Sequence, residues 1–548
     1  MSCYGASLRS DENGMRKTRR WLACCGLIVL AGALISVVPV RLSASPPPQQ
    51  RQGSDLSAGC EPDRPVIAHH VGGVTVTSPT GKEATPPIPC VVRTGYRVGE
   101  ESIVVTNAGT VLLRPAWETD AVGPTSGAIR SDDQGANWET PLVAANDTNM
   151  WVDRKTGRVF WMTSGSGNLK TPRSPLLMIS DDDGKTWNAG GQSHIAADHV
   201  QVFGGPPTTS MKNFLKGYPN VVYACMGHKG LKCEKSQDGG MTWGPELDIP
   251  YPPGLEALQG SAQDCSAFGL QGVVDKDGTV IVPYNPCNRP YVAITHDEGG
   301  TWQLVAVAKT DTIGYGYPSL GIDEQQNLYA AWVGASDRLL YLAISRDHGL
   351  HWGTPMMIGA PGVNETAIPY LVSGGRGHVA VSYYASKNAT VPFPVTCFAY
   401  EPQNPPRQRF PTLNCPGYED ETWNTYVTET WNALDEEPLF WSTTLNDPAQ
   451  PTWYGCSPSE IGVIRHLGDK GEGVAGPGYY RGCYPGLVLD YYGATMASDG
   501  TVWVGFAQEC PYGRRASGNP NCPGTGDGGL FGLVGHLAPR RNETAAKR

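Results

Sequence analysis

The chain has no surplus of basic charge. Its 548 residues carry 42 Lys and Arg against 52 Asp and Glu, a formal net charge of -10, and only 17% of all residues are charged. A protein that binds nucleic acid needs a basic face to meet the phosphate backbone. The composition therefore argues against a nucleic-acid partner.

Long apolar runs are absent beyond residue 38. The one such run, Leu22–Val38, follows the basic stretch Met15–Arg20 and precedes small residues that end at Ala44. This order predicts a cleaved signal peptide over residues 1–44, with Met15 as an alternative start, and therefore a secreted, extracellular protein. The alternative is an uncleaved membrane anchor, because the run reaches the lower length limit of a membrane-spanning helix. We expect membrane association only in that case.

The cysteines lack the C-x-x-C spacing that metal-binding and redox sites use. Three of the 15 cysteines fall in the expected leader, so an even number remains, as a disulfide framework requires. The others fall in neighbouring pairs, although sequence alone leaves their connectivity open. The simplest pairing joins Cys60 to Cys90, Cys225 to Cys233, Cys265 to Cys287, Cys397 to Cys415, Cys456 to Cys483 and Cys510 to Cys522.

Glycine, proline and tryptophan, in contrast, are abundant, with 68 Gly, 46 Pro and 15 Trp. This composition is typical of many short strands joined by tight turns. Five segments share the pattern Ser/Thr-x-Asp-x-Gly-x-x-Trp. They begin at Ser131, Ser180, Ser236, Thr295 and Ser345, at spacings of 49, 56, 59 and 50 residues.

The shared residues suit a β-hairpin turn. The Asp can accept backbone N–H bonds, the Gly can adopt a positive φ, the hydroxyl can close the turn, and the Trp can bury a large apolar area between sheets. The pattern resembles the Asp-box, or BNR, repeat of the sialidase superfamily of β-propellers, over roughly residues 92–384. In that superfamily the Asp-box joins the third and fourth strands of a blade, on the rim away from the ligand. The resemblance therefore implies that the Asp residues of these turns are structural.

A second repeat, in which two strands flank a Gly or Asn turn, predicts the number of blades. We expect an all-β fold, a β-propeller of four-stranded antiparallel blades, with seven blades favoured and the six of sialidases as the alternative. The propeller should span residues 66–539, with an irregular disulfide-braced insertion at 385–489 and an early strand at 73–77 that completes the last blade. A linker at 45–65 and a disordered tail at 540–548 should flank it. The copies begin at Ser102, Trp151, Tyr218, Gly272, Leu320, Leu371 and Thr495.

The resemblance also implies a site. Sialidases bind the substrate carboxylate with three arginines, use a Tyr activated by a Glu as nucleophile, and use an Asp as acid/base. Arg97, Asp120 and Arg338 match the first arginine, the acid/base and the third arginine. Arg289 and Tyr370 are weaker matches for the second arginine and the nucleophile. The Glu position holds Gln271, whose amide cannot take a proton from a tyrosine.

Acidic residues before the first strands of the blades allow a different site. If these carboxylates ring one mouth of the central channel, they would need a counter-ion, and oxygen ligands favour Ca²⁺. The alternative is that they only end strands and accept backbone N–H bonds. The residues are Glu100 or Glu101, Asp147, Asp198, Asp264, Asp311, Glu365 and Asp490.

Two functions remain open on this evidence. The first is an exported, exo-α-sialidase-like glycoside hydrolase that acts on a glycan or glycoconjugate at the ligand face and requires no cofactor. The second is a non-catalytic propeller that binds a glycan, a protein or a cation. A monomer is expected in either case.

Overall fold

The computed structural model describes residues 59–80, 84–97, 101–114, 128–140, 149–165, 173–195, 200–227, 230–255, 269–309, 313, 317–389, 421–454, 493–510 and 529–538. The chain divides into two compact units, Met1–Ser54 and Asp55–Arg548, and every described residue belongs to the second. The expected signal peptide and C-terminal tail lie outside the described residues. Within the described part, no helix has the length and apolar character needed to cross a bilayer.

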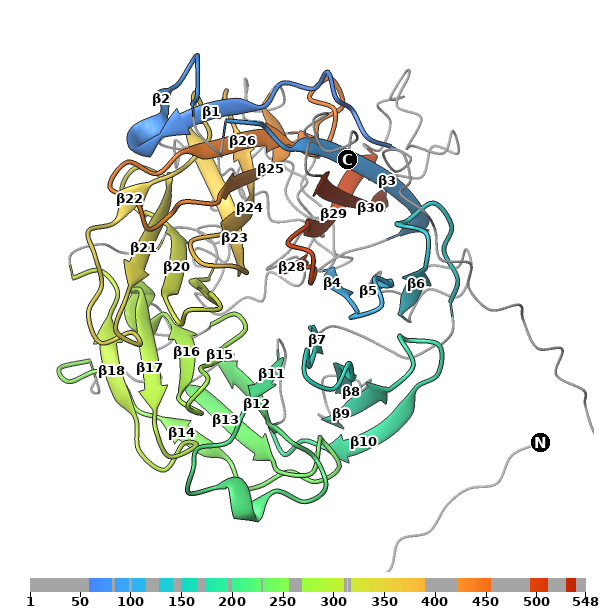
Figure 1. The fold of residues 1–548 in the computed structure, drawn as a ribbon, viewed down its shortest axis with the longest axis vertical. Coiled ribbons are helices and arrows are strands. Elements are labelled where there is room, and N and C mark those ends of the chain that lie inside the picture. The colour runs from blue at the N-terminus through green and yellow to red at the C-terminus, as the bar shows by residue number, and fades with distance from the viewer. Residues whose placement is uncertain are drawn as a thin grey trace, which may run out of the picture. The chain divides into compact units, whose positions relative to one another are not determined.

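Seven antiparallel sheets are arranged as a seven-bladed β-propeller, as the repeats predicted (Figure 1). The first strands of the blades contact one another in sequence order, from β4 through β7, β11, β15, β19 and β23 to β28, and β28 contacts β4 again. This circle of contacts closes the ring. Five sheets have four strands, the sheet of the first blade has three, and the sheet of the sixth is extended.

The strands of the first four blades follow in chain order. Blade one holds β4 (Ser102–Val105), β5 (Val111–Arg114) and β6 (Ile129–Ser131); blade two β7 (Met150–Val152), β8 (Val159–Gly165), β9 (Arg173–Ser180) and β10 (Asn188–Gln192); blade three β11 (Gln201–Gly205), β12 (Val221–Gly227), β13 (Leu231–Ser236) and β14 (Leu247–Ile249); blade four β15 (Val273–Val274), β16 (Val280–Tyr284), β17 (Tyr291–Thr295) and β18 (Gln303–Ala306).

The remaining blades use both ends of the chain. Blade five holds β19 (Ser319–Ile322), β20 (Leu328–Val333), β21 (Leu340–Ser345) and β22 (Met356–Met357); blade six β23 (Glu365–Ser373), β24 (Val379–Ser386), β25 (Thr422–Thr430) and β26 (Phe440–Thr444), with β27 (Trp453–Tyr454), β1 (Ile67–His70) and β2 (Val74–Thr75); blade seven β28 (Gly493–Met496), β29 (Val502–Cys510), β30 (Gly529–Ala538) and β3 (Ile88–Arg97). Short 3₁₀ helices are η1 (Val71–Gly73), η2 (Lys212–Phe214) and η4 (Pro286–Asn288).

The apolar cores lie between neighbouring blades. The second strands are buried along their whole length in β5, β16 and β20, and they read as near-continuous apolar runs because both faces of the sheet are covered. The tryptophan of each Asp-box is half-buried and packs against a different one of these cores. The predicted burial of these tryptophans between sheets is therefore confirmed.

The Asp-box turns are held by the same hydrogen bonds in all five copies. In the second copy, the Ser180 hydroxyl donates to the Asp182 carboxylate at 2.9 Å and accepts the Gly184 N–H at 2.9 Å. The carboxylate in turn accepts the Thr186 N–H at 2.9 Å. Since these bonds span at most four residues, the motif builds its turn locally. In each of these blades, the Asp-box turn follows the end of the third strand. The side of the ring that carries these strand ends is here called the box face.

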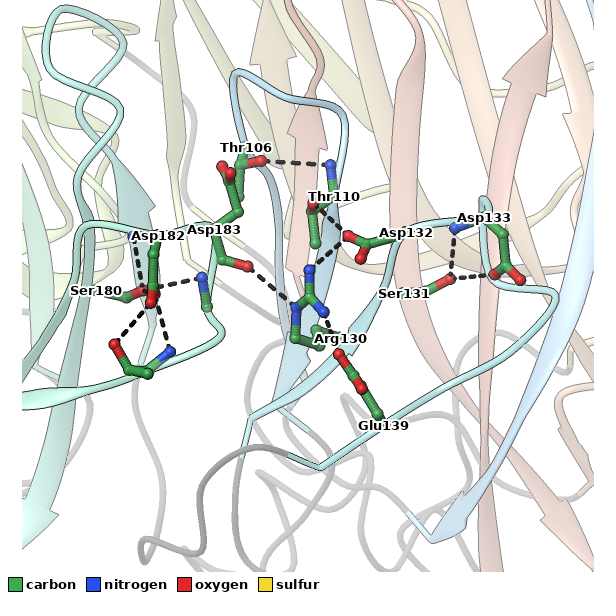
Figure 2. A network of polar contacts seen from close by, with 12 residues as sticks. Thr106, Thr110, Arg130, Ser131, Asp132, Asp133, Glu139, Ser180, Asp182 and Asp183 are labelled. Atoms are coloured by element: carbon green, nitrogen blue, oxygen red, sulfur yellow. Dashed lines mark hydrogen bonds and ion pairs between the residues drawn. The ribbon is translucent and has the colours of Figure 1, made fainter. Parts of the chain in front are cut away.

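Neighbouring Asp-boxes are also joined to each other. Arg130, just before the first box, makes ion pairs with Asp132 and Glu139 (Figure 2). Its Nε also donates to the backbone carbonyl of Asp183 in the second box, at 3.3 Å. Thr110 completes the group by donating to Asp132 at 2.7 Å. This network joins the first blade to the second at the box face.

The residue before the conserved glycine of each box has a positive φ. The angle is 60° at Gln134 and 49° at Glu298, a region that is strained for residues with a Cβ. Glu298 compensates with contacts, because its carboxylate accepts the N–H and the hydroxyl of Thr208 in the preceding blade, at 2.8 and 2.6 Å. Gln134 is exposed. The backbone strain at Glu298 is therefore offset by hydrogen bonds to another blade. For Gln134 the structure records no such bond.

The last blade is completed by a different N-terminal strand from the one expected. Residues 73–77 do not join blade seven; β1 and β2 instead extend blade six through pairing of β1 with β26. The closing strand is β3, which pairs with β30 from Ile88 to Arg97. Val91 and Val92 of β3 pack against the adjoining apolar core, which a short exposed strand such as β2 could not fill.

Two predicted disulfides are confirmed. Cys60 bonds to Cys90, next to the closing strand, and Cys225 bonds to Cys233 across β12 and β13. Cys287 is also disulfide-bonded, and its expected partner Cys265 lies outside the described residues, as do the side chains of the other three expected pairs. Disulfides persist in oxidising compartments, so they point to an extracytoplasmic protein.

A pair of glycine substitutions tests the strain in the box turns. We expect Gln134→Gly to raise the free energy of unfolding by about 0.5–1 kcal/mol, because glycine relieves the left-handed backbone. Glu298→Gly should lower it by about 1–3 kcal/mol, because two buried bonds to Thr208 are lost. Urea unfolding of both variants measures the difference, and equal changes of the same sign would contradict the assignment.

Candidate functional site

Except for Tyr370, which lies in the middle of its strand, the described candidate residues lie at the edge opposite the Asp-boxes, here called the loop face. In each blade this edge carries the start of the first strand and the link from the second strand to the third. Gln271 precedes β15, and Tyr370 lies in the first strand of blade six. Arg289 and Arg338 lie in second-to-third links, and Arg97 ends β3 just before blade one. Asp120 and the side chain of Arg97 lie outside the described residues.

Polar side chains join the first strands to one another below this face. The Ser102 hydroxyl accepts the Met150 N–H at 2.7 Å, and the Ser319 hydroxyl accepts the Leu371 N–H at 2.8 Å. The Asn149 amide oxygen accepts the Val202 N–H at 2.7 Å in the same way. Each acceptor lies one blade before its donor. Hydrogen bonds therefore supplement apolar packing where the strands approach the ring axis.

Gln271 belongs to this set of contacts. Its amide Nε2 donates to the backbone carbonyl of Val202 at 2.8 Å, joining blade four to blade three. A carboxylate at this position has no proton to donate and would face a carbonyl oxygen. The hydrogen bond to Val202 is therefore a structural reason for an amide where the sialidase pattern has Glu.

Tyr370 is buried among apolar residues. Its side chain is 8% exposed and packs in the core that also contains Leu270 and Met496. Burial raises the pKa of its hydroxyl well above the ordinary value. Within the part of the chain that the structure describes, no carboxylate accepts a hydrogen bond from this hydroxyl. These surroundings oppose formation of a nucleophilic phenolate.

Arg338 forms an ion pair across two blades. Its guanidinium lies 3.3 Å from Oε1 of Glu365 at the start of β23, and the carboxylate is buried while the arginine side chain is 25% exposed. The Arg338 carbonyl accepts the N–H and the hydroxyl of Thr366 at 2.8 and 2.7 Å. These contacts hold the blade-five link against blade six and leave part of the guanidinium accessible.

Glu101 is, with Glu365, a buried carboxyl group at the loop-face start of a first strand. It directly precedes β4, is fully buried, and lies near Arg114 at the end of β5. Burial raises the pKa of Glu101 to about 7, against the lowering effects of its own backbone N–H and of the Arg114 charge. A carboxyl group with this pKa exchanges protons near neutral pH, as general acids and bases do.

Sequence reasoning named Glu101, Glu365 and Arg338 but missed Arg114, the basic neighbour of Glu101. Arg114 ends an apolar strand, and a strand end at the loop face is the only sequence signal that could have singled it out. A further pair, the Tyr341 hydroxyl and the Asp337 carboxylate at 2.6 Å, lies beside Arg338.

The remaining candidates do not converge in the described structure. Arg289 is exposed after η4, and its N–H donates to the Pro286 carbonyl at 3.2 Å. The four proposed calcium ligands, Asp147, Asp198, Asp264 and Asp490, lie outside the described residues. Over the described ranges, one group of His, Cys or acidic side chains is close enough to share a metal ion, namely Cys60, Cys90 and His536. Its two cysteines form a disulfide, so it offers no thiolates.

Comparison with known proteins yields only distant structural likeness. No family model matches the chain, and no curated protein matches its sequence. The NanB sialidase of Streptococcus pneumoniae is similar over 84% of this chain and 70% of its own, with 12% identity and a TM-score of 0.37. The GH93 α-L-arabinofuranosidase of Fusarium graminearum is similar over 80% and 94%, with 12% identity and a TM-score of 0.36. The GH74 enzyme of Niastella koreensis is similar over 79% and 69%, with 14% identity and a TM-score of 0.38.

Likeness at this level assigns no function. It is a distant match to glycoside hydrolase propellers, and the residues of the loop face have to carry any functional conclusion.

Substitution of Glu101 should change how stability depends on pH. The pKa of Glu101 is about 7 in the folded state, against an ordinary value near 4.5. Between these two pH values the folded protein binds more protons than the unfolded protein, so it loses stability as the pH rises. Glu101→Gln removes this loss, so its stability relative to wild type should increase by up to about 3 kcal/mol between pH 4.5 and pH 8. Denaturant unfolding across this pH range measures the difference. Glu324→Gln, at an exposed position, is the control, and parallel curves for all three proteins would contradict the assignment.

Restoring the sialidase Glu should cost stability rather than add activity. Gln271→Glu removes the bond to the Val202 carbonyl and places a carboxylate against it, so we expect a loss of about 1–3 kcal/mol in the free energy of unfolding. Gln271→Leu, which removes the donor without adding charge, separates the two effects. A Gln271→Glu variant that is as stable as wild type and gains sialidase turnover would show that the amide has no structural role.

Proposed function

We propose that this protein is an exported glycoside hydrolase that acts on glycans at the loop face, with carboxyl groups rather than Tyr370 as its reacting groups. The observation that supports this is the presence of two buried carboxyl groups at the loop-face ends of first strands, in different electrostatic surroundings. Glu101 has a pKa of about 7, whereas Glu365 is ion-paired to Arg338. Pairs of carboxyl groups whose surroundings separate their protonation states are the usual basis of acid–base chemistry on glycosides.

The roles follow from the protonation states. In glycoside hydrolysis, one carboxylic acid protonates the oxygen of the leaving sugar, and one carboxylate attacks the sugar or activates a water molecule. Glu101 is suited to the first role, because burial keeps it protonated near neutral pH. Glu365 is assigned the second role, because the guanidinium of Arg338 at 3.3 Å favours a charged carboxylate.

Asp120 stays a second candidate for the acid. It falls between β5 and β6 in the sequence, in the link that follows Arg114, so its link belongs to the same end of blade one as Glu101. Arg97, Arg289 and Arg338 are proposed as groups that bind a carboxylate or hydroxyl of the sugar, since guanidinium groups can donate two parallel bonds to such ligands.

Export is part of the proposal. The order of basic, apolar and small residues over 1–44 supports a signal peptide, and the Cys60–Cys90 and Cys225–Cys233 disulfides agree with an oxidising compartment. Glycans of cell surfaces and of the surrounding medium are the substrates available there.

A non-catalytic glycan-binding propeller is the second candidate. Two contacts favour it: the Gln271 amide already donates to a backbone carbonyl, and Arg338 already balances the charge of Glu365. Such a site can recognise a ligand through Arg338 without cleaving it.

Turnover of fluorogenic sugars by matched variants tests the enzyme proposal. A panel of 4-methylumbelliferyl glycosides that includes the sialic acid glycoside should contain a substrate. With it, Glu101→Gln should lower kcat about 10²–10⁴-fold and remove a pH limb near 7, because a general acid is lost. Asp120→Ala should have the larger effect if Asp120 is the acid, whereas Tyr370→Phe should stay within a few-fold of wild type.

Exposed Glu324 supplies the control, since Glu324→Gln removes a carboxyl group on the box side of blade five and should leave turnover unchanged. If Tyr370→Phe abolished turnover while Glu101→Gln and Asp120→Ala did not, the carboxyl mechanism would be excluded. Tight binding on a glycan array without turnover of any sugar would establish the binding function instead.

A further inference from the structure

In blade three, the link between the first and second strands is longer than a hairpin turn requires. In blades one, four, five and seven, the first and second strands are joined by tight turns. In blade four, for example, the Asp275 N–H donates to the Thr279 carbonyl at 2.9 Å and the Gly278 N–H donates to the Asp275 carbonyl at 3.1 Å. In blade three the link runs over residues 206–220 and contains η2. The link extends from the box face, where the first strand of each blade ends.

The link exposes an aromatic residue between two lysines. Phe214 is 59% exposed at the end of η2, and Lys212 and Lys216 on either side of it are exposed as well. Residues 206–220 contain no Asp or Glu, although the whole chain has a net charge of -10. The segment is therefore a locally basic and apolar projection on an acidic protein.

A second exposed apolar side chain lies on the same rim. Met241, in the Asp-box of blade three, is 52% exposed. The Lys216 N–H donates to the Gln237 carbonyl at 2.8 Å, which ties the link to this box. The one acidic group of the box, Asp238, already accepts the N–H groups of Met241 and Thr242 at 3.1 and 2.8 Å. Its charge is therefore partly neutralised within its own turn.

We propose that this rim, defined by Lys212, Phe214, Lys216 and Met241, binds a bilayer surface that carries anionic headgroups. Single exposed apolar residues are common and need no explanation, but an aromatic residue between lysines on a projecting link is the arrangement that binds membrane interfaces. The lysines would meet the headgroups, and Phe214 and Met241 would enter the boundary between headgroups and acyl chains. The basic charge of the link and its exposed apolar side chains are complementary to such a surface, which favours a bilayer as the partner.

This contact would also orient the molecule. The rim lies on the box face, and the arginines and carboxyl groups of the candidate site lie on the opposite, loop face. A propeller held by its box face would therefore present the loop face to the medium.

Vesicle co-sedimentation tests the proposal. The full chain is expressed in an exporting host and recovered from the medium, so that membrane-retained protein is left out. It is mixed with vesicles of phosphatidylcholine alone, or of phosphatidylcholine with about one-third phosphatidylglycerol. We expect binding to the anionic vesicles only, weakened by added salt. Lys212→Glu with Lys216→Glu should lower the partition coefficient at least tenfold, and so should Phe214→Ser with Met241→Ser at unchanged charge.

Leu350→Ser is the matched control, because Leu350 occupies the position of Met241 in the box of blade five and is 38% exposed. It should bind as wild type does. Equal binding to both vesicles, loss on charge reversal without loss in Phe214→Ser with Met241→Ser, or an equal loss in the control would overturn the proposal. Retention on an immobilised sulfated polysaccharide without vesicle binding would overturn it too, and would assign the rim to a polyanion.

Discussion

The pairing of β3 with β30 is the contact on which the rest of the ring depends. Blade seven combines the N-terminal strand with three C-terminal strands, so the two ends of the chain hold each other in one sheet. Without it, β30 would present an unpaired edge and the two ends of the chain would share no sheet. Because β3 ends at Arg97 and β4 begins at Ser102, this pairing also places the loop-face end of blade one, including Glu101, against blade seven.

The two faces of the ring use carboxylates in opposite ways. On the box face, hydrogen bonds lower the pKa of Asp182, Asp238, Asp297 and Asp347 although burial acts against this, and the donors belong to the same turn. On the loop face, Glu365 and Glu101 lie near guanidinium groups that come from other strands. Local bonds satisfy the first group within the turn, whereas the second depends on how the blades are placed. Chemistry is therefore expected where the charges are set by tertiary contacts.

The candidate site was predictable in its location but only partly in its members. Arg338 and Glu365 could be named because each falls at a recognisable point of a blade, but nothing in their surroundings in the sequence indicates that they meet. Gln271 could be noted as a departure from the sialidase pattern, while its bond to Val202 depends on the contact between blades three and four. Tyr370 matched a motif, and its burial in an apolar core could not be read from that motif.

The sequence by itself determined the repeating architecture. The five Asp-box turns, the alternating strands and the near-neighbour cysteines are local patterns, since the bonds that realise the turns span at most four residues and Cys225 and Cys233 face each other across adjacent strands. Only the tertiary structure decided that β3 rather than residues 73–77 closes the ring, and which charges share a face of the molecule. The physical reason is distance along the chain: these contacts join groups from different blades, and their energy depends on burial and orientation that no short segment encodes.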